Sequence, residues 1–213
     1  NIMWLDCILL FPLVILDLER LIHQDKCFLY CITLGLCILS NYYISIMICI
    51  FLLIYFLVQL LLASCHGVQY LKKIGEFALY SLLAGGLAAI VLLPEIYALQ
   101  TTASSSISFP QTIVSYFSIF DMIARHLVDV DVHIGLDHWP NIYCGVAILF
   151  LIPLYILNRR VNFYEKFLYC FLLLFFYLSF SNNVLNFIWH GLHFPNSLPA
   201  RQSFIYIFLI LSM

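Results

Sequence analysis

Long runs of apolar residues, separated by short polar segments, recur along the whole chain and limit what it can fold into. The clearest run, residues 44–63, has no charged residue and matches the about 20 residues that a membrane-spanning helix needs. The other runs cover residues 2–18, 27–40, 74–99, 142–157, 163–180 and the chain from 204 onward. Apolar runs of this density need lipid around them. The sequence therefore predicts an all-α, polytopic transmembrane helical bundle with about seven apolar runs.

Charged residues make up 9% of the 213 residues and hydrophobic ones 64%, whereas roughly a quarter of an ordinary soluble domain is charged. This composition excludes a soluble globular protein. The net charge of −2 and the lack of a basic tract argue against nucleic acid as a partner. The eight cysteines lie mostly inside apolar runs, which favours buried thiols over a disulfide framework. Because the chain lacks a starting Met and stops inside an apolar run, we expect residues 1–213 to be a fragment of a single transmembrane domain.

Positively charged residues gather in alternate connections between the runs. If Asn1 lies outside the cell, the segments 17–26, 65–73 and 158–166 are cytoplasmic, and they hold seven of the nine lysines and arginines. The positive-inside rule therefore predicts a multi-pass protein of the cell membrane in this orientation. Four parts of the chain are then extracytoplasmic: the Asn1 end, the turn at Asn41, and the segments 100–140 and 181–204.

The two long outer segments differ in pattern. Segment 100–140 is too polar to span, but its apolar residues recur at steps of three and four, which indicates a helix lying in the membrane interface. These apolar residues are Ile107, Ile113, Val114, Phe117, Phe120, Ile123 and Leu127. Segment 181–204 is polar and aromatic and lies between two uncharged runs, so we expect it to form a loop at the outer surface.

Three polar residues near the outer ends of apolar runs are candidates for a site. Asp6 lies one turn into a run, where a carboxylate is costly, on the order of 2.5 to 3.5 kcal/mol at a helix centre. It is either a partly hydrated interfacial acid or part of a catalytic site. Asn41 belongs to an SNYY turn typical of an interface. Glu95 follows Pro94 and has the same two interpretations as Asp6.

The last outer segment contributes His190, His193 and Arg201. A His-x-x-His spacing can bind a metal on a helix, but Gly191 and Pro195 argue against a regular helix and the spacing fixes no third ligand. We therefore predict neither a metal nor a cofactor, and expect the histidines to bond to backbone or to contact a polar substrate. Arg201 is either a snorkelling interface anchor or a clamp for a phosphate at the membrane surface.

Acidic residues and histidines also gather in segment 100–140. A solvated acidic face explains them better than a site for a divalent ion or for sugar hydroxyls, although both interpretations remain open. The residues are Asp121, His126, Asp129, Asp131, His133, Asp137 and His138.

Four stretches together resemble the YfhO family of bacterial multi-pass membrane proteins, and the resemblance covers the whole chain. They are NIMWLDCILLFPLVILDLERLI, SNYY, LLPEIYALQTTASSS and IWHGLHFPNSLPARQSF. The family is similar to glycosyltransferases of the GT-C architecture. The resemblance implies transfer of a sugar from a polyprenyl-phosphate carrier to a cell-envelope acceptor such as lipoteichoic acid, among membrane lipids on the outer face.

Enzymes of that architecture usually carry their acidic catalytic residue in the first outer loop, so the resemblance places the main carboxylate upstream of Asn1 and leaves Asp6 as the candidate within this chain. A carboxylate would activate an acceptor hydroxyl, and Arg201 would stabilise the charge developing on the lipid phosphate. A transporter or permease, or a membrane assembly protein without catalysis, is the alternative. Polar residues gather at the outer surface rather than at the midplane, which favours surface chemistry.

Overall fold

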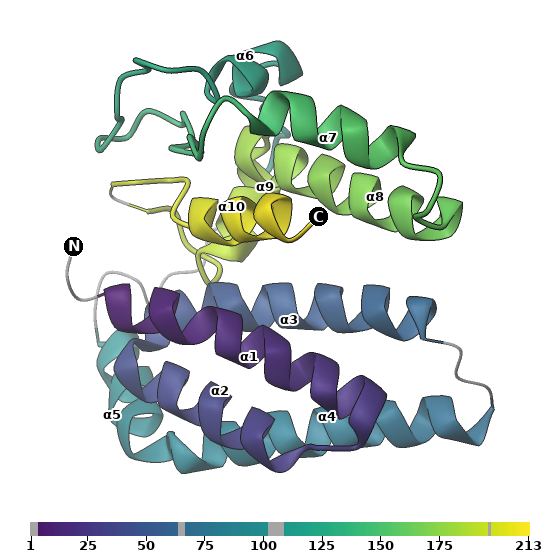
Figure 1. Cartoon of the computed structure of the whole chain (residues 1–213). Helices are drawn as coiled ribbons and strands as arrows, with labels where there is room; N and C mark the ends of the chain where they lie inside the picture. Colours follow the sequence, from purple (N-terminus) through teal and green to yellow (C-terminus); the bar gives the residue numbers. More distant parts are fainter. Residues whose placement is uncertain (1–3, 64–66, 102–108, 196) are drawn as a thin grey trace. The chain divides into compact units, whose positions relative to one another are not determined.

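A computed structural model describes residues 4–63, 67–101, 109–195 and 197–213. Within these ranges the chain forms ten helices and no strand, with one isolated antiparallel bridge between Ser115 and Asn182. The chain divides into two compact units, residues 1–106 and residues 107–213. The predicted all-α class is confirmed (Figure 1).

The first unit is a helical bundle in which α2 packs on both α1 and α4. Aromatic side chains join its helices, with ring centroids 5.8 Å apart for Phe11 and Phe51 and 4.1 Å apart for Phe56 and Phe77. Neighbouring helices are thereby held by apolar contacts, as in a membrane bundle. Its helices are α1 (Leu5–Gln24), α2 (Phe28–Ser40), α3 (Tyr42–Leu62), α4 (Val68–Leu87) and α5 (Ala89–Gln100).

A sharp bend separates α4 from α5. The two helices meet at Ala88 at an angle of 77°. Gly85 and Gly86 lie just before the bend, and glycine is among the weakest helix formers because it loses the most backbone freedom. The predicted run 74–99 is therefore two helices rather than one.

In the second unit α8 leads directly into α9. Asn182 lies between the two helices, and its side-chain Oδ1 accepts a hydrogen bond from the Val184 amide at 2.8 Å, which caps α9. Phe176 of α8 packs against both Trp189 and Tyr206 with tilted rings, at ring-centroid distances of 5.5 and 5.8 Å. The helices are α6 (Ile119–Ala124), α7 (Ile148–Leu157), α8 (Phe163–Ser181), α9 (Asn183–Trp189) and α10 (Ser203–Ser212).

Two described helices, α3 and α8, are long and apolar enough to cross a membrane, and the bent pair of α4 and α5 makes a third if it counts as one span. Helix α3 has 21 residues, which at about 1.5 Å per residue matches the roughly 30 Å of a bilayer core. Helices α2, α7 and α10 are apolar but shorter. Each predicted apolar run thus coincides with helix, although run 142–157 becomes helical only from Ile148.

The structure differs from expectation in the two long polar segments. No continuous interfacial helix forms in the described part of 100–140 after Thr101: only α6 is helical there, because a capping box of Ser118 and Asp121 starts it and Arg125 ends it. Segment 181–204 is not a plain loop, since α9 occupies its first third.

Candidate functional site

Three of the predicted site residues lie at one end of the first unit. The Cys7 thiol, next to Asp6, donates to the Asn41 carbonyl oxygen at 3.7 Å, so the start of α1 lies beside the start of α3. Tyr42 follows Asn41, and its hydroxyl interacts with the Glu95 side chain of α5. The bundle therefore brings Asp6, Asn41 and Glu95 to the same end, which is the end predicted to be extracytoplasmic.

Asp6, Asn41 and Glu95 differ in exposure and in hydrogen bonding. Asp6 is exposed in the first turn of α1, where the helix dipole favours a carboxylate. Asn41 caps α3, because its side-chain Oδ1 accepts a hydrogen bond from the Ile44 amide at 3.0 Å. Glu95 is half-buried against Tyr42. Of the two carboxylates, Asp6 is more exposed than Glu95 and therefore more open to a substrate.

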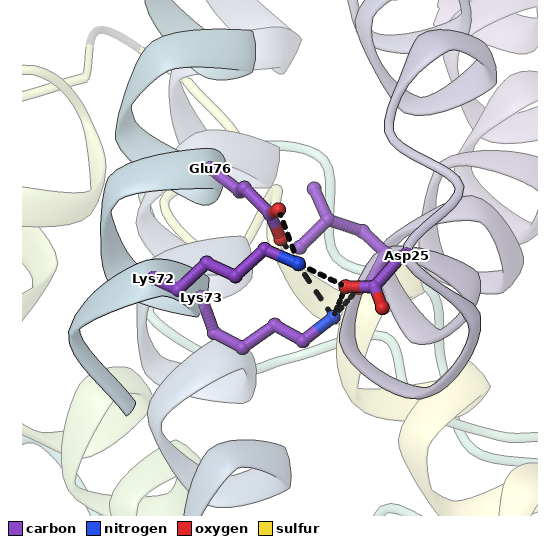
Figure 2. Close-up of polar contacts among 5 residues, drawn as sticks. Asp25, Lys72, Lys73 and Glu76 are labelled. Atoms are coloured by element: carbon purple, nitrogen blue, oxygen red, sulfur yellow. Dashed lines mark hydrogen bonds and ion pairs between the residues drawn. The ribbon is translucent and has the colours of Figure 1, made fainter. Parts of the chain in front are cut away.

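The opposite end of the first unit holds a charged cluster of Asp25, Lys72, Lys73 and Glu76, which Figure 2 shows. The buried Lys73 donates from Nζ to Asp25 Oδ1 at 2.5 Å and to the Leu21 carbonyl at 2.7 Å. Lys72 reaches Asp25 at 3.3 Å and Glu76 at 3.4 Å. The hydrogen bond from Lys73, and then that from Lys72, hold the pKa of Asp25 below its usual value. Segments 17–26 and 65–73, both predicted to be cytoplasmic, thus meet at one end.

The predicted residues of the second unit come together in the α9–α10 loop, residues 190–202. His190 ends α9 and is buried, and its Nδ1–H donates to the Asn186 carbonyl at 2.8 Å. Burial, with a smaller contribution from the charges of Arg201 and His193, lowers the pKa of His190 to about 4. The imidazole is therefore neutral at pH 7, with its proton on Nδ1.

Arg201 is half-buried in the same loop. Its Nη2 donates to the Ser197 carbonyl at 3.1 Å, and its charge acts on His190. His193 is half-buried, and its charge acts on His190 as well. The structure thus places His190, His193 and Arg201 together in the α9–α10 loop. Through its hydrogen bond to Ser197, Arg201 is oriented by its own loop.

Three described residues of this loop, Gly191, Leu192 and Leu198, have a left-handed backbone. Gly191, with φ of 71°, ends α9 in a Schellman motif: its amide bonds to the Ile188 carbonyl, and the Leu192 amide bonds to the Phe187 carbonyl at 3.0 Å. Leu192 and Leu198 have φ of 65° and 49°, a left-handed conformation that costs a bulky residue on the order of 1–3 kcal/mol. Strain of this kind is concentrated at ligand clamps and active sites.

Sequence reasoning missed two residues here, Asn186 and Gln202. Asn186 is 2% exposed and donates from Nδ2 to the Pro199 carbonyl at 2.6 Å, while Gln202 is fully buried just before α10. Among the described residues, Asn186 Oδ1 and both side-chain polar atoms of Gln202 have no hydrogen-bond partner. A polar position inside the apolar pattern VLNFIW was the available signal for Asn186. The sequence offers no comparable signal for Gln202, because Gln202 adjoins a polar segment.

The acidic and histidine-rich part of segment 100–140 does not form one site. Its side chains have separate structural roles. Asp121 belongs to the α6 cap, His133 pairs with Asp137 at 3.4 Å, and His138 stacks on Tyr116 with ring centroids 3.4 Å apart. Within the described ranges no three of the His, Cys, Asp and Glu side chains are grouped as metal ligands would be.

His126 is the buried member of that set. Its Nδ1–H donates to the Met122 carbonyl at 3.0 Å, so Nε2 is left as the acceptor for the Tyr206 hydroxyl at 3.2 Å. Burial lowers the pKa of His126. The pair borders a mainly apolar cavity of about 320 Å³ between α6, α8 and α10. Arg125, in the same segment, is buried and donates to the Asp131 and Pro140 carbonyls.

The family model described as "Bacterial membrane protein YfhO" matches residues 1–213, the whole chain. No curated protein and no solved structure matches.

Proposed function

Because this chain belongs to the YfhO family of bacterial membrane proteins, we propose that it forms part of a membrane glycosyltransferase. The enzyme would transfer a sugar from a polyprenyl-phosphate carrier to a cell-envelope acceptor such as lipoteichoic acid on the outer face of the membrane. The observation that carries this proposal is the α9–α10 loop, in which Arg201 is held beside His190 and His193.

The loop suits the lipid-phosphate side of such a reaction. When the anomeric carbon is attacked, the bond to the phosphate oxygen breaks and negative charge grows on the phosphate. The planar guanidinium of Arg201 can meet two phosphate oxygens at once, and its contact with Ser197 fixes its direction. His190 stays neutral at pH 7 because burial lowers its pKa to about 4, so the positive charge at the loop comes from Arg201.

For the acceptor side, Asp6 is the proposed base within this chain, with Asn41 and Glu95 as proposed substrate contacts. Asp6 is exposed at an end of the first unit that has no part of the Lys72 and Lys73 cluster. That separation supports the proposed orientation, because the positive-inside rule assigns the lysine end to the cytosol. Asp6→Asn should lower sugar transfer if Asp6 takes the acceptor proton.

The test uses the full-length protein, a polyprenyl-phosphate-linked sugar and an envelope acceptor. Arg201→Gln should lower the rate of sugar transfer by about 10²- to 10³-fold, as for loss of one group that stabilises a developing anion. Arg159→Gln, which removes an exposed cation from the turn between α7 and α8, is the matched control and should retain activity. Equal transfer by Arg201→Gln and wild type would remove the basis of the proposal.

A transporter is the second candidate, because the 77° bend between α4 and α5 resembles the broken helices that bind substrates in transporters. In such proteins the freed backbone at the break works with nearby ionisable groups. Residues 85–89 carry no ionisable side chain, so we favour sugar transfer. Sugar or ion uptake into vesicles containing the full-length protein would reverse this preference.

A further inference from the structure

Residues 130–134 of the second unit lie between α6 and α7 and form neither helix, turn nor bend (Figure 1). Every second residue of this part of the chain is bound to its own fold through the backbone. The Asn141 carboxamide bonds to both the amide and the carbonyl of His133, at 3.2 and 2.8 Å, as the backbone of a neighbouring strand would. The carbonyls of Asp131 and Gly135 accept hydrogen bonds as well. This alternation is that of a β-strand with one paired edge.

The other edge of the segment is unpaired. In the part of the chain that the structure describes, the backbone groups of Val130, Val132 and Ile134 make no hydrogen bond. Val132 and Ile134 are 73% and 71% exposed, so this edge is open to its surroundings. The three residues are β-branched and alternate with Asp131 and His133. β-branched residues at every second position are typical of a strand, and the unpaired edge of a strand is a template for pairing with another chain.

The order of residues along this edge favours a second copy of the same chain as the partner. In an antiparallel ladder centred on Val132, each Val130 pairs with Ile134 of the second copy, so β-branched side chains lie opposite one another. The same register places Asp131 opposite His133 of the second copy, an acid opposite a base, on both sides of the two-fold axis. Registers shifted by two residues lose this pair, and one of them places two copies of Asp131 opposite each other, which is destabilising.

We propose that residues 130–134 of two copies of this chain pair as an antiparallel β-ladder and so form a dimer. This inference does not depend on the proposed sugar transfer. Each hydrogen-bonded pair exchanges two N–H···O bonds, which satisfies the backbone groups of the free edge. Insertion of the exposed Val132 and Ile134 into lipid fits the segment less well, because lipid would leave these backbone groups unbound and would draw Asp131 out of water.

The test uses the full-length protein, with its own cysteines replaced and one new cysteine, in membranes treated with a mild oxidant. Facing residues of a hydrogen-bonded pair have Cα atoms about 5.5 Å apart, within the range that a disulfide spans. Val132→Cys should therefore run as a linked dimer on a non-reducing gel. Leu136→Cys is the matched control, at an apolar residue of the same segment that is 64% exposed. It should stay monomeric, because this register places the two copies of Leu136 about 26 Å apart along the ladder.

The register has a test of its own. Copies with Asp131→Cys and copies with His133→Cys, expressed together with different tags, should link to each other, because facing residues of a non-hydrogen-bonded pair have Cα atoms about 4.5 Å apart. Without the oxidant, Val132→Lys should lower the fraction of dimer measured by native mass spectrometry, since it puts like charges directly opposite each other. Leu136→Lys should leave that fraction unchanged.

A Val132→Cys protein that stays monomeric overturns the inference, and protection of both cysteines from a water-soluble maleimide would then place the segment in lipid. Equal linking of Val132→Cys and Leu136→Cys overturns it as well, because chance collision and not a ladder would join the copies. Val132 and Leu136 are exposed, so these changes should not impair folding. Either result leaves the proposed sugar transfer standing.

Discussion

The buried His190 gives the α9–α10 loop a defined response to pH. Its pKa is about 4 in the folded protein, whereas the ordinary value is 6.5. Between these values the unfolded chain binds a proton at this residue and the folded chain does not. Protonation therefore favours unfolding: stability from His190 is complete above pH 6.5, declines as the pH falls, and levels off below about pH 4.

The size of this effect follows from the same two values. One pKa unit corresponds to about 1.4 kcal/mol, so a decrease from 6.5 to about 4 corresponds to about 3 kcal/mol of stability that is lost on acidification. For a chain of this length, each kcal/mol shifts the melting temperature by about 2–4 °C. On acidification the melting temperature of wild type should therefore fall by several degrees more than that of a variant without an ionisable group at this position.

The assay compares thermal unfolding of wild type and His190→Gln in detergent from pH 7 to pH 4. The difference in melting temperature between the two proteins should change by several degrees across this range, in favour of the variant at low pH. His133→Gln is the control, because the His133 side chain is partly exposed and is not enclosed by the loop. A constant difference between wild type and His190→Gln at every pH would refute the burial argument.

Three further changes test the packing that positions the site. Lys73→Met should lower the free energy of unfolding by about 1–3 kcal/mol, because the Leu21 carbonyl loses its donor, and Lys72→Met should cost less; equal losses in chemical unfolding would contradict this assignment. Gly191→Ala should cost about 1 kcal/mol, since its φ of 71° disfavours a side chain, and an unchanged melting temperature would argue against the Schellman turn. Asn41→Ala removes the cap of α3 and should cost about 1 kcal/mol, with Asn41→Ser restoring most of it; failure of that rescue would count against capping.

The helices of this chain could be predicted because their cause is local. Runs such as the one that forms α3 are apolar on every side, so they become helical wherever lipid or other helices surround them. The exact ends depended on caps: Asn41 and Asn182 start helices through side-chain hydrogen bonds that the sequence shows only as isolated amides. The helix α9 was missed for that reason.

Segment 100–140 could not be predicted correctly, because its periodic apolar residues, apart from Ile107, which lies outside the described residues, do not share one helix face. Phe117 is buried against Trp139, whereas Phe120 is exposed only three residues later. The segment is held instead by tertiary contacts, such as the hydrogen bond from the Tyr116 amide to the Ser181 carbonyl. Contacts between residues so far apart in sequence leave no periodic signal.

The candidate site was predictable in part. His190, His193 and Arg201 lie within 12 residues, so a single loop necessarily keeps them close together. Cys7, the neighbour of Asp6, meets Asn41 because α1 and α2 form a helical hairpin, which follows from two apolar runs joined by a short polar turn. Gln202 was missed because its importance lies in its burial, and burial of one side of a turn depends on packing that the sequence does not display.

The central claim, that the α9–α10 loop works on the outer face, is tested most directly by labelling thiols from outside the cell. Single cysteines would replace Ser197 in the loop and Arg159 in the turn between α7 and α8, in a full-length protein whose own cysteines are changed to serine or alanine. A membrane-impermeant maleimide should label position 197 in intact cells and label position 159 only after the membrane is opened. Labelling of 159 but not 197 in intact cells would contradict the account.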